Sequence, residues 1–297
     1  MAEIRDASTV VLVREGRAPF EVFMMRRAGG HEFMANAWVF PGGRIDERDC
    51  VDAAVDVIPG LDRPSAARRL GAEIDQSTAL GLYVAALRET FEEAGVLLAS
   101  PVGEEQMLVI DDDDSRRRFD ALRQEVDQGE LGLDELCRRE ELVLRADRLI
   151  FFAHWITPDF ESRRYDTRFF LATAPPGQKP SHDEGELTHS TWWTPAEAIE
   201  KYREDEILLA PPTLRILEEI GTFESIDELV AELSKRERPP TILPHLLDSD
   251  ASEVTLLLPG DPEYPSQDPA LAASSPVRDG ITRMIYRDGK WISVCTD

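Results

Sequence analysis

A long amphipathic pattern over residues 77–98 constrains the fold of this chain more than any other feature. When residues are placed at 100° intervals, the carboxylates of Glu89, Glu92 and Glu93 share one narrow face. The opposite face carries apolar side chains, namely Leu80, Val84, Leu87, Phe91 and Ala94. The pattern predicts a helix that buries one face against a sheet, presents three carboxylates on the other, and is stopped by Gly95.

The three carboxylates lie within little more than one helical turn and repel one another, by roughly 0.2–0.5 kcal/mol for each exposed pair. A divalent cation would offset this repulsion, and oxygen ligands suit Mg²⁺ or Mn²⁺ better than zinc. The alternative is an acidic face in contact with solvent, because the chain has 58 acidic residues. The spacing alone leaves both interpretations open.

The composition is that of a globular chain and excludes several classes of function. The 297 residues are 42% hydrophobic and 31% charged, which allows a sizeable core. No apolar stretch has the length of a membrane span, and a net charge of -25 disfavours binding to nucleic acid. Three widely spaced cysteines, at positions 50, 137 and 295, predict neither a metal site nor a disulfide framework. We therefore expect a reducing, cytoplasmic location.

Strand patterns flank the long helix and predict an α+β fold, with a mixed sheet packed between helices. The expected extended segments are a hairpin at 10–25 and strands at 37–40, 149–155, 167–173 and 190–193. Thr194-Pro195 has the form of a helix N-terminus, and a further helix is expected at 212–221.

Insertions and an extension enlarge the expected domain. The predicted boundaries are 1–222 for the main domain, about 49–76 for an insertion within it, about 101–146 for a helical insert, and 223–297 for a C-terminal extension. The first insertion contains a short helix after Pro64. The extension contains a helix at 226–235 and a closing hairpin that turns at Asp288-Gly289. It is also a candidate surface for a homodimer.

The long helix carries a family motif, Arg88-Glu89-Thr90-Phe91-Glu92-Glu93-Ala94-Gly95-Val96, which fits the helical half of the Nudix box. Gly43 and Asp49 supply the loop half, although aspartate replaces the usual glutamate and residues 50–87 separate the halves. The chain resembles the Nudix hydrolases. This resemblance implies an α/β/α sandwich and metal-dependent hydrolysis of a nucleoside diphosphate linked to another group.

The resemblance also implies roles for individual residues. Glu89, Glu92 and Glu93 would bind Mg²⁺ or Mn²⁺, with the backbone carbonyl of Gly43 as a further ligand. Glu93 would be the central catalytic glutamate. Arg88 would act in catalysis by orienting the glutamates through hydrogen bonds, a role that its spacing from Glu92 also allows in a simple helical ion pair.

A catalytic base is expected in the loop before Trp192. Within that loop we favour Glu186 over Glu184, while an acidic surface loop without a catalytic role is the alternative. His182 or His189 could instead be the base, since histidine titrates near neutral pH.

Two arginine pairs are candidates for binding substrate phosphates. Arg26 and Arg27 end a strand, and Arg164 follows Arg163 in a second loop. In each case an ordinary surface charge is the alternative.

The substrate is less constrained than the family. The long insertion, Phe40-Pro41-Gly42-Gly43 and the segment 163–170 resemble the branch of coenzyme A and acyl-CoA diphosphatases, although Glu32 stands near a position where that branch has arginine. Coenzyme A or an acyl derivative is therefore the favoured substrate. Two alternatives stay open, namely hydrolysis of ADP-ribose or NADH-type dinucleotides, and a Nudix-fold module that senses a nucleotide without cleaving it.

Overall fold

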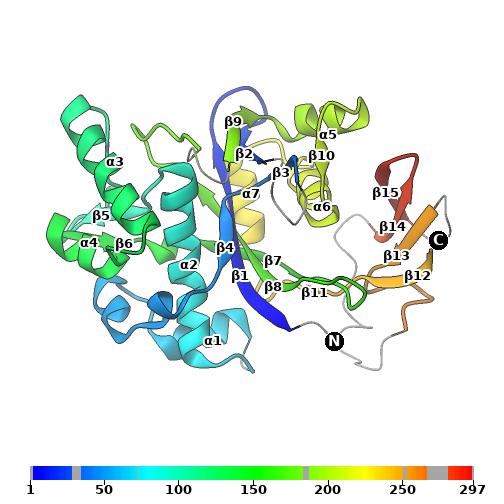
Figure 1. Ribbon diagram of the computed structural model, residues 1–297, viewed down its shortest axis with the longest axis horizontal. Helices are drawn as coiled ribbons and strands as arrows, with labels where there is room; N and C mark the ends of the chain where they lie inside the picture. Colours follow the sequence, from blue (N-terminus) through cyan, green and yellow to red (C-terminus); the bar gives the residue numbers. More distant parts are fainter. Residues whose placement is uncertain are drawn as a thin grey trace.

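The computed structural model describes residues 3–28, 35–71, 73–182, 187–249, 253–265 and 280–295. A mixed sheet of nine strands forms its centre, built around the long strand β1 (Ile4–Arg14). β1 runs parallel to β8 (Arg164–Thr173) and pairs antiparallel with β2 (Glu21–Arg27) through Val13 and Val22. The hairpin predicted at the N-terminus is therefore confirmed (Figure 1).

The other strands complete the sheet on both sides of this pair. The order is β10 (Leu208–Leu209), β3 (Ala37–Val39), β2, β1, β8, β7 (Ile150–Ile156) and β11 (Thr241–Ile242), with β4 (Gly42–Arg44) paired to β1 and β9 (Leu187–Trp193) paired to β2. All four single strands expected from the sequence are present. The predicted α+β class, with a mixed sheet between helices, is confirmed.

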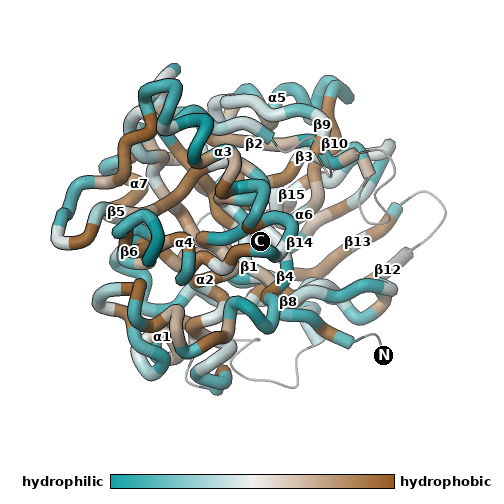
Figure 2. Tube along the Cα trace, turned by 60° about the vertical axis from the view of Figure 1, so that its left-hand side comes forward, coloured by the Kyte–Doolittle hydropathy of each residue, from teal (hydrophilic) through white to brown (hydrophobic). Residues whose placement is uncertain are grey.

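Alternating side chains of β1 enter two separate apolar cores, one on each face of the sheet. Val10 and Leu12 contribute to the core beneath α2 (Gln76–Ala94), whereas Val11 and Val13 contribute to the core on the opposite face. Hydrophobic stretches accordingly run through the middle of the molecule, where β1 and α2 lie, and hydrophilic residues dominate its outer turns (Figure 2). Both faces of the sheet are therefore covered.

The helix α2 is the predicted long helix, with a different end. Its first turn is capped by Asp75, which accepts a hydrogen bond from Thr78 N at 2.9 Å, and all five residues of the predicted apolar face are buried. The helix ends at Ala94 rather than at 98, because Gly95 adopts a left-handed conformation with φ of 67°. The expected stop at Gly95 is thus confirmed, and the expected extension beyond it is wrong.

Replacement of Gly95 by alanine is expected to lower the free energy of unfolding by about 1–2 kcal/mol, because a side chain disfavours the left-handed conformation. The new Cβ would also lie 2.9 Å from Arg123 Nη1. Gly60→Ala is the matched control, since its φ is also positive at 76° and its Cβ would meet nothing within 4 Å. Chemical denaturation of both variants measures the difference. An equal loss in the two would show that contact with Arg123 costs nothing.

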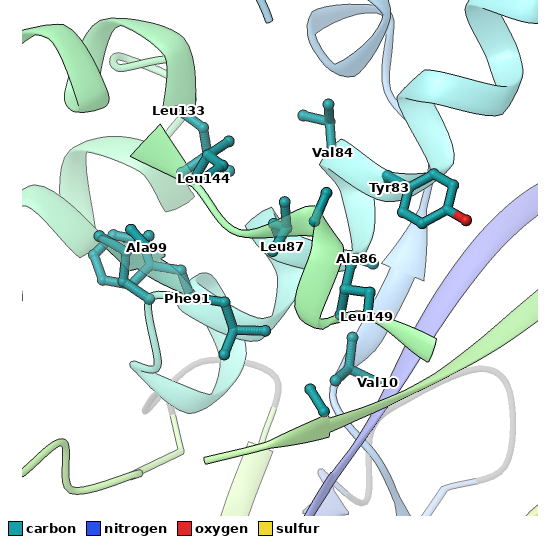
Figure 3. Close-up of a cluster of buried hydrophobic side chains, with 14 of the residues drawn as sticks. Val10, Tyr83, Val84, Ala86, Leu87, Phe91, Ala99, Leu133, Leu144 and Leu149 are labelled. Atoms are coloured by element: carbon teal, nitrogen blue, oxygen red, sulfur yellow. The ribbon is translucent and has the colours of Figure 1, made fainter. Parts of the chain in front are cut away.

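Helices of the two predicted insertions pack against α2. The helix predicted after Pro64 is α1 (Arg63–Leu70), and the helical insert contains α3 (Asp113–Asp127) and α4 (Leu133–Glu140) between β5 (Ala99–Pro101) and β6 (Leu142–Leu144). Figure 3 shows Leu133 and Leu144 of this insert close to Val84 and Leu87. As a result most described residues of α2 are buried, and its C-terminal half lines a large cavity.

Three helices and a small sheet cover the other face. They are α5 (Pro195–Arg203), α6 (Pro211–Ile220), α7 (Ile226–Leu233), and a sheet of β12 (His245–Ser249), β13 (Glu253–Leu257), β14 (Ile281–Arg287) and β15 (Lys290–Cys295). The hairpin predicted at Asp288-Gly289 is present, whereas β12 and β13 were not predicted. Leu229 and Met284 share the core of this face, and the domain boundary at 222 stays a prediction.

No helix in the described part of the chain combines the length and apolar character required to cross a membrane.

Candidate active site

Arg88 joins the two halves of the sequence motif. Its side chain is only 4% exposed, and it donates from Nε and Nη2 to the carboxylate of Asp49 at 2.8 and 2.9 Å. Its Nη1 donates to Glu89 Oε1 at 2.8 Å and to Glu92 Oε2 at 2.6 Å. A further bond, from Nη2 to the carbonyl oxygen of Arg44, reaches strand β4 at 3.0 Å. The insertion between the two halves therefore leaves them in contact.

The glycine turn at β4 brings the backbone against the acidic face of α2. The amide of Gly42 donates to Glu93 Oε2 at 2.7 Å. A Cβ atom at Gly43 would lie 2.3 Å from Glu89 Oε1, so a side chain there would displace the carboxylate. Glycine at position 43 thus allows the carboxylates to approach the backbone, where the Gly43 carbonyl could join them as an oxygen donor.

Arg48 is a site residue that the sequence reasoning missed. Its Nη2 donates to Glu92 Oε1 at 3.0 Å, and its Nη1 donates to the carbonyl oxygen of Val126 at 2.7 Å. It therefore ties the acidic face to α3 of the helical insert. A lone arginine in an insertion has no periodic pattern, and its position beside Asp49 was the only available indication.

Burial has the largest effect on the pKa values of Glu89 and Glu92. It raises the pKa of Glu92 to about 7, although Arg88 opposes the shift. Burial likewise raises the pKa of Glu89, again against the effect of Arg88 and assisted by repulsion from Asp49. The pKa of Arg88 is raised despite its own burial, chiefly by its hydrogen bond to Asp49. A cation brought to this site would favour the ionised form of both glutamates.

The carboxylates line a cavity of about 990 Å³ that is rich in arginine. Its lining includes Glu89, Glu92 and Glu93, together with Arg27, Arg163, Arg164 and Tyr165. Of the arginines expected to bind phosphate, Arg27 and Arg164 thus reach the same cavity as the glutamates. Such a mixture of acids and arginines suits a metal-bound anion.

Arg26 behaves differently from its neighbour. Its Nη2 donates to Asn36 Oδ1 at 3.1 Å, and it is not among the residues that line the cavity.

Glu186 and Glu184 lie outside the described residues, but the chain on both sides is described. Before this segment, Ser181 N donates to the carbonyl oxygen of Ala94, at the end of α2, at 3.0 Å. After it, Leu187 pairs with Arg27, which lines the cavity. His182, the alternative base, is 3.0 Å from Ser190 Oγ through Nδ1.

The donor set fits Mg²⁺ or Mn²⁺ in its chemistry. The three glutamates and the Gly43 carbonyl offer only oxygen, and the contact between Gly43 and Glu89 leaves no room for a side chain. Within the described residues, no group of three or more histidine, cysteine, aspartate or glutamate side chains is arranged around one metal position. Instead Glu89 and Glu92 are turned toward Arg88, and Glu93 toward Gly42.

The fold resembles a solved Nudix enzyme. A NUDIX hydrolase from Alicyclobacillus acidocaldarius superposes with a TM-score of 0.63 at 24% identity, over 78% of this chain and 97% of that one. This similarity supports the predicted Nudix fold.

Sequence relatives carry a more specific name. An acyl-coenzyme A diphosphatase NUDT19 from Xenopus laevis is 28% identical, over 92% of this chain and 79% of the relative. The protein of the same name from Gallus gallus is 29% identical, over 91% and 79%. The sequence profile of the NUDT19 Nudix domain matches residues 4–220. The chain therefore belongs to the NUDT19 Nudix domain family, and its expected place among the Nudix hydrolases is confirmed.

Proposed function

We propose that this protein hydrolyses the diphosphate bond of coenzyme A or an acyl-coenzyme A. The observation that carries the proposal is the cavity that Glu89, Glu92 and Glu93 line together with several arginines. The names of the relatives, acyl-coenzyme A diphosphatases, support the same substrate class. A cavity of about 990 Å³ is large enough for a nucleotide with an attached group.

Glu89, Glu92, Glu93 and the Gly43 carbonyl would hold Mg²⁺ or Mn²⁺ in this proposal. Bound there, the metal would offset the charge of the diphosphate and lower the pKa of a water molecule. Such compensation is needed because the chain itself carries a net charge of -25.

The remaining roles belong to the chain's own residues. Arg88 would hold Glu89 and Glu92 in place through the hydrogen bonds described above. Arg27 and Arg164 would bind substrate oxygens as donors. Glu186 would accept a proton from the attacking water, with His182 or His189 as the alternative base.

The substrate can be tested with a panel of coenzyme A, an acyl-coenzyme A, ADP-ribose and NADH. In Mg²⁺ we expect coenzyme A to give adenosine 3′,5′-bisphosphate and phosphopantetheine, with both products identified by mass spectrometry. Cleavage of only ADP-ribose or NADH would refute the substrate assignment while keeping the reaction class. Binding without any cleavage would instead favour a nucleotide-sensing module.

A cytoplasmic location and a homodimer remain predictions from the sequence.

A further inference from the structure

Arg164 is a buried arginine with an unusual set of contacts. It begins β8, it is only 7% exposed, and it lines the cavity. Among the residues that the structure describes, its side chain makes one hydrogen bond, from Nε to the carbonyl oxygen of Thr157 at 3.0 Å, and forms no ion pair. Tyr165 N donates to Thr157 Oγ1 at 3.0 Å. Thr157 therefore holds both Arg164 and the backbone of the next residue in place, at the end of the hairpin formed by β7 and β8.

The other strongly buried arginines differ from Arg164. Arg88, Arg145, Arg168 and Arg215 each form an ion pair with at least one carboxylate, for example Arg168 Nη1 with Asp6 at 2.7 Å. Removing a guanidinium from water without a partner anion is costly, which is why buried charges are normally paired. Since no described carboxylate forms an ion pair with Arg164, its Nη groups stay available to an anion that enters the cavity.

Arg164 and the glycine turn beside the carboxylates lie at different levels along the sheet. Gly43 pairs with Ser8, and Ser8 pairs with Arg168, so Arg168 marks the level of Gly43 on β8. Arg164 precedes that level by roughly 13 Å of strand. A ligand with two separate anionic groups fits this separation.

We propose that Arg164 binds a phosphate monoester of the substrate that is separate from the diphosphate, and so selects nucleotides that carry one. This inference rests on the proposed function, because coenzyme A has such a group on its ribose. The planar guanidinium suits a terminal phosphate, to which it can donate two hydrogen bonds at once. Arg164 would then determine specificity, while the hydrolytic chemistry stays with the α2 carboxylates.

Product binding tests the proposal without turnover. The full chain is titrated calorimetrically with adenosine 3′,5′-bisphosphate and with adenosine 5′-monophosphate, which lacks the 3′-phosphate. We expect wild-type protein to prefer the bisphosphate, and Arg164→Gln to weaken its binding about tenfold to a hundredfold while binding of the monophosphate is unchanged. Arg117→Gln, an equal change of charge on an exposed arginine, should leave both affinities unaltered.

Kinetics provide the second readout. With coenzyme A, Arg164→Gln should raise KM with little change in kcat, whereas with 3′-dephospho-coenzyme A both parameters should match wild type. The proposal would be overturned if Arg164→Gln weakened binding of the bisphosphate and the monophosphate equally, or impaired hydrolysis of coenzyme A and 3′-dephospho-coenzyme A equally. It would also be overturned if the variant lost neither affinity nor activity. If Arg164→Gln fails to fold, Arg164→Lys, which keeps the charge, replaces it in both experiments. This variant should lose part of the preference for ligands that carry the 3′-phosphate. Failure of wild-type protein to cleave any coenzyme A substrate would instead refute the proposed function, since product binding is measured independently.

Discussion

Replacing Glu93 by glutamine is expected to lower turnover at least about a hundredfold in Mg²⁺ while the fold survives. The change removes one negative charge from the carboxylate group that is proposed to bind the metal, at nearly constant shape. The hydrogen bond from Gly42 N to Glu93 Oε2 can be kept by the amide oxygen, so the glycine turn should stay in place. Initial rates with coenzyme A, together with thermal unfolding, measure the two effects separately.

The matched control for this variant is Glu200→Gln, which makes the same chemical change at an exposed position on α5. It should turn over at the wild-type rate. Wild-type turnover in Glu93→Gln as well would exclude the proposed metal site. A large loss of stability in Glu93→Gln would show that Glu93 has a structural role, and the Mg²⁺ affinity of the folded fraction would then decide between the two.

The sequence was most informative where residues close together in the chain determine the structure by themselves. The apolar face of α2 could be predicted because helical periodicity places Leu80 and Leu87 on one side, and both are buried against the sheet. The end of the helix could be predicted because glycine tolerates the left-handed conformation that Gly95 adopts. Both inferences needed only residues close in sequence.

Contacts between distant segments were harder to predict. Ala85 and Ala86 lie on the acidic side of the predicted helix and suggest open space above it, yet both are fully buried. Arg48 reaches Glu92 across the fold, and no spacing in the sequence encodes that contact. The strands β12 and β13 are short and pair only with other segments of the C-terminal region, so their local patterns were weak.

The residues of the site could be predicted from the sequence, but their arrangement in space could not. The motif identified Glu89, Glu92, Glu93 and Arg88 without any structure. It could not show that Arg88 holds Glu89 and Glu92 together with Asp49. Adjacent residues in a strand point to opposite faces, but the motif could not show that Arg27 is the one that lines the cavity while Arg26 bonds to Asn36.

The aspartate that replaces the usual glutamate of the motif gives the second large prediction. Asp49→Asn is expected to lower the free energy of unfolding by about 3 kcal/mol, since it removes the charge that faces the buried guanidinium of Arg88. The side chain of Asp49 is 1% exposed, so water cannot replace the lost partner. Because Arg88 orients Glu89 and Glu92, turnover should fall at least about tenfold in the same variant.

Asp46→Asn is the control for the stability measurement, because it changes the same group three residues earlier in a solvent-exposed place. Asp46 is 49% exposed and lies 3.3 Å from Arg48 Nε, an ion pair expected to contribute less than about 1 kcal/mol. Urea denaturation should therefore separate the two variants clearly. If Asp49→Asn were no less stable than Asp46→Asn, Glu89 and Glu92 would suffice to hold Arg88. The loop half of the motif would then contribute only the glycine turn, and the long insertion after it would be tolerated because nothing in the site depends on Asp49.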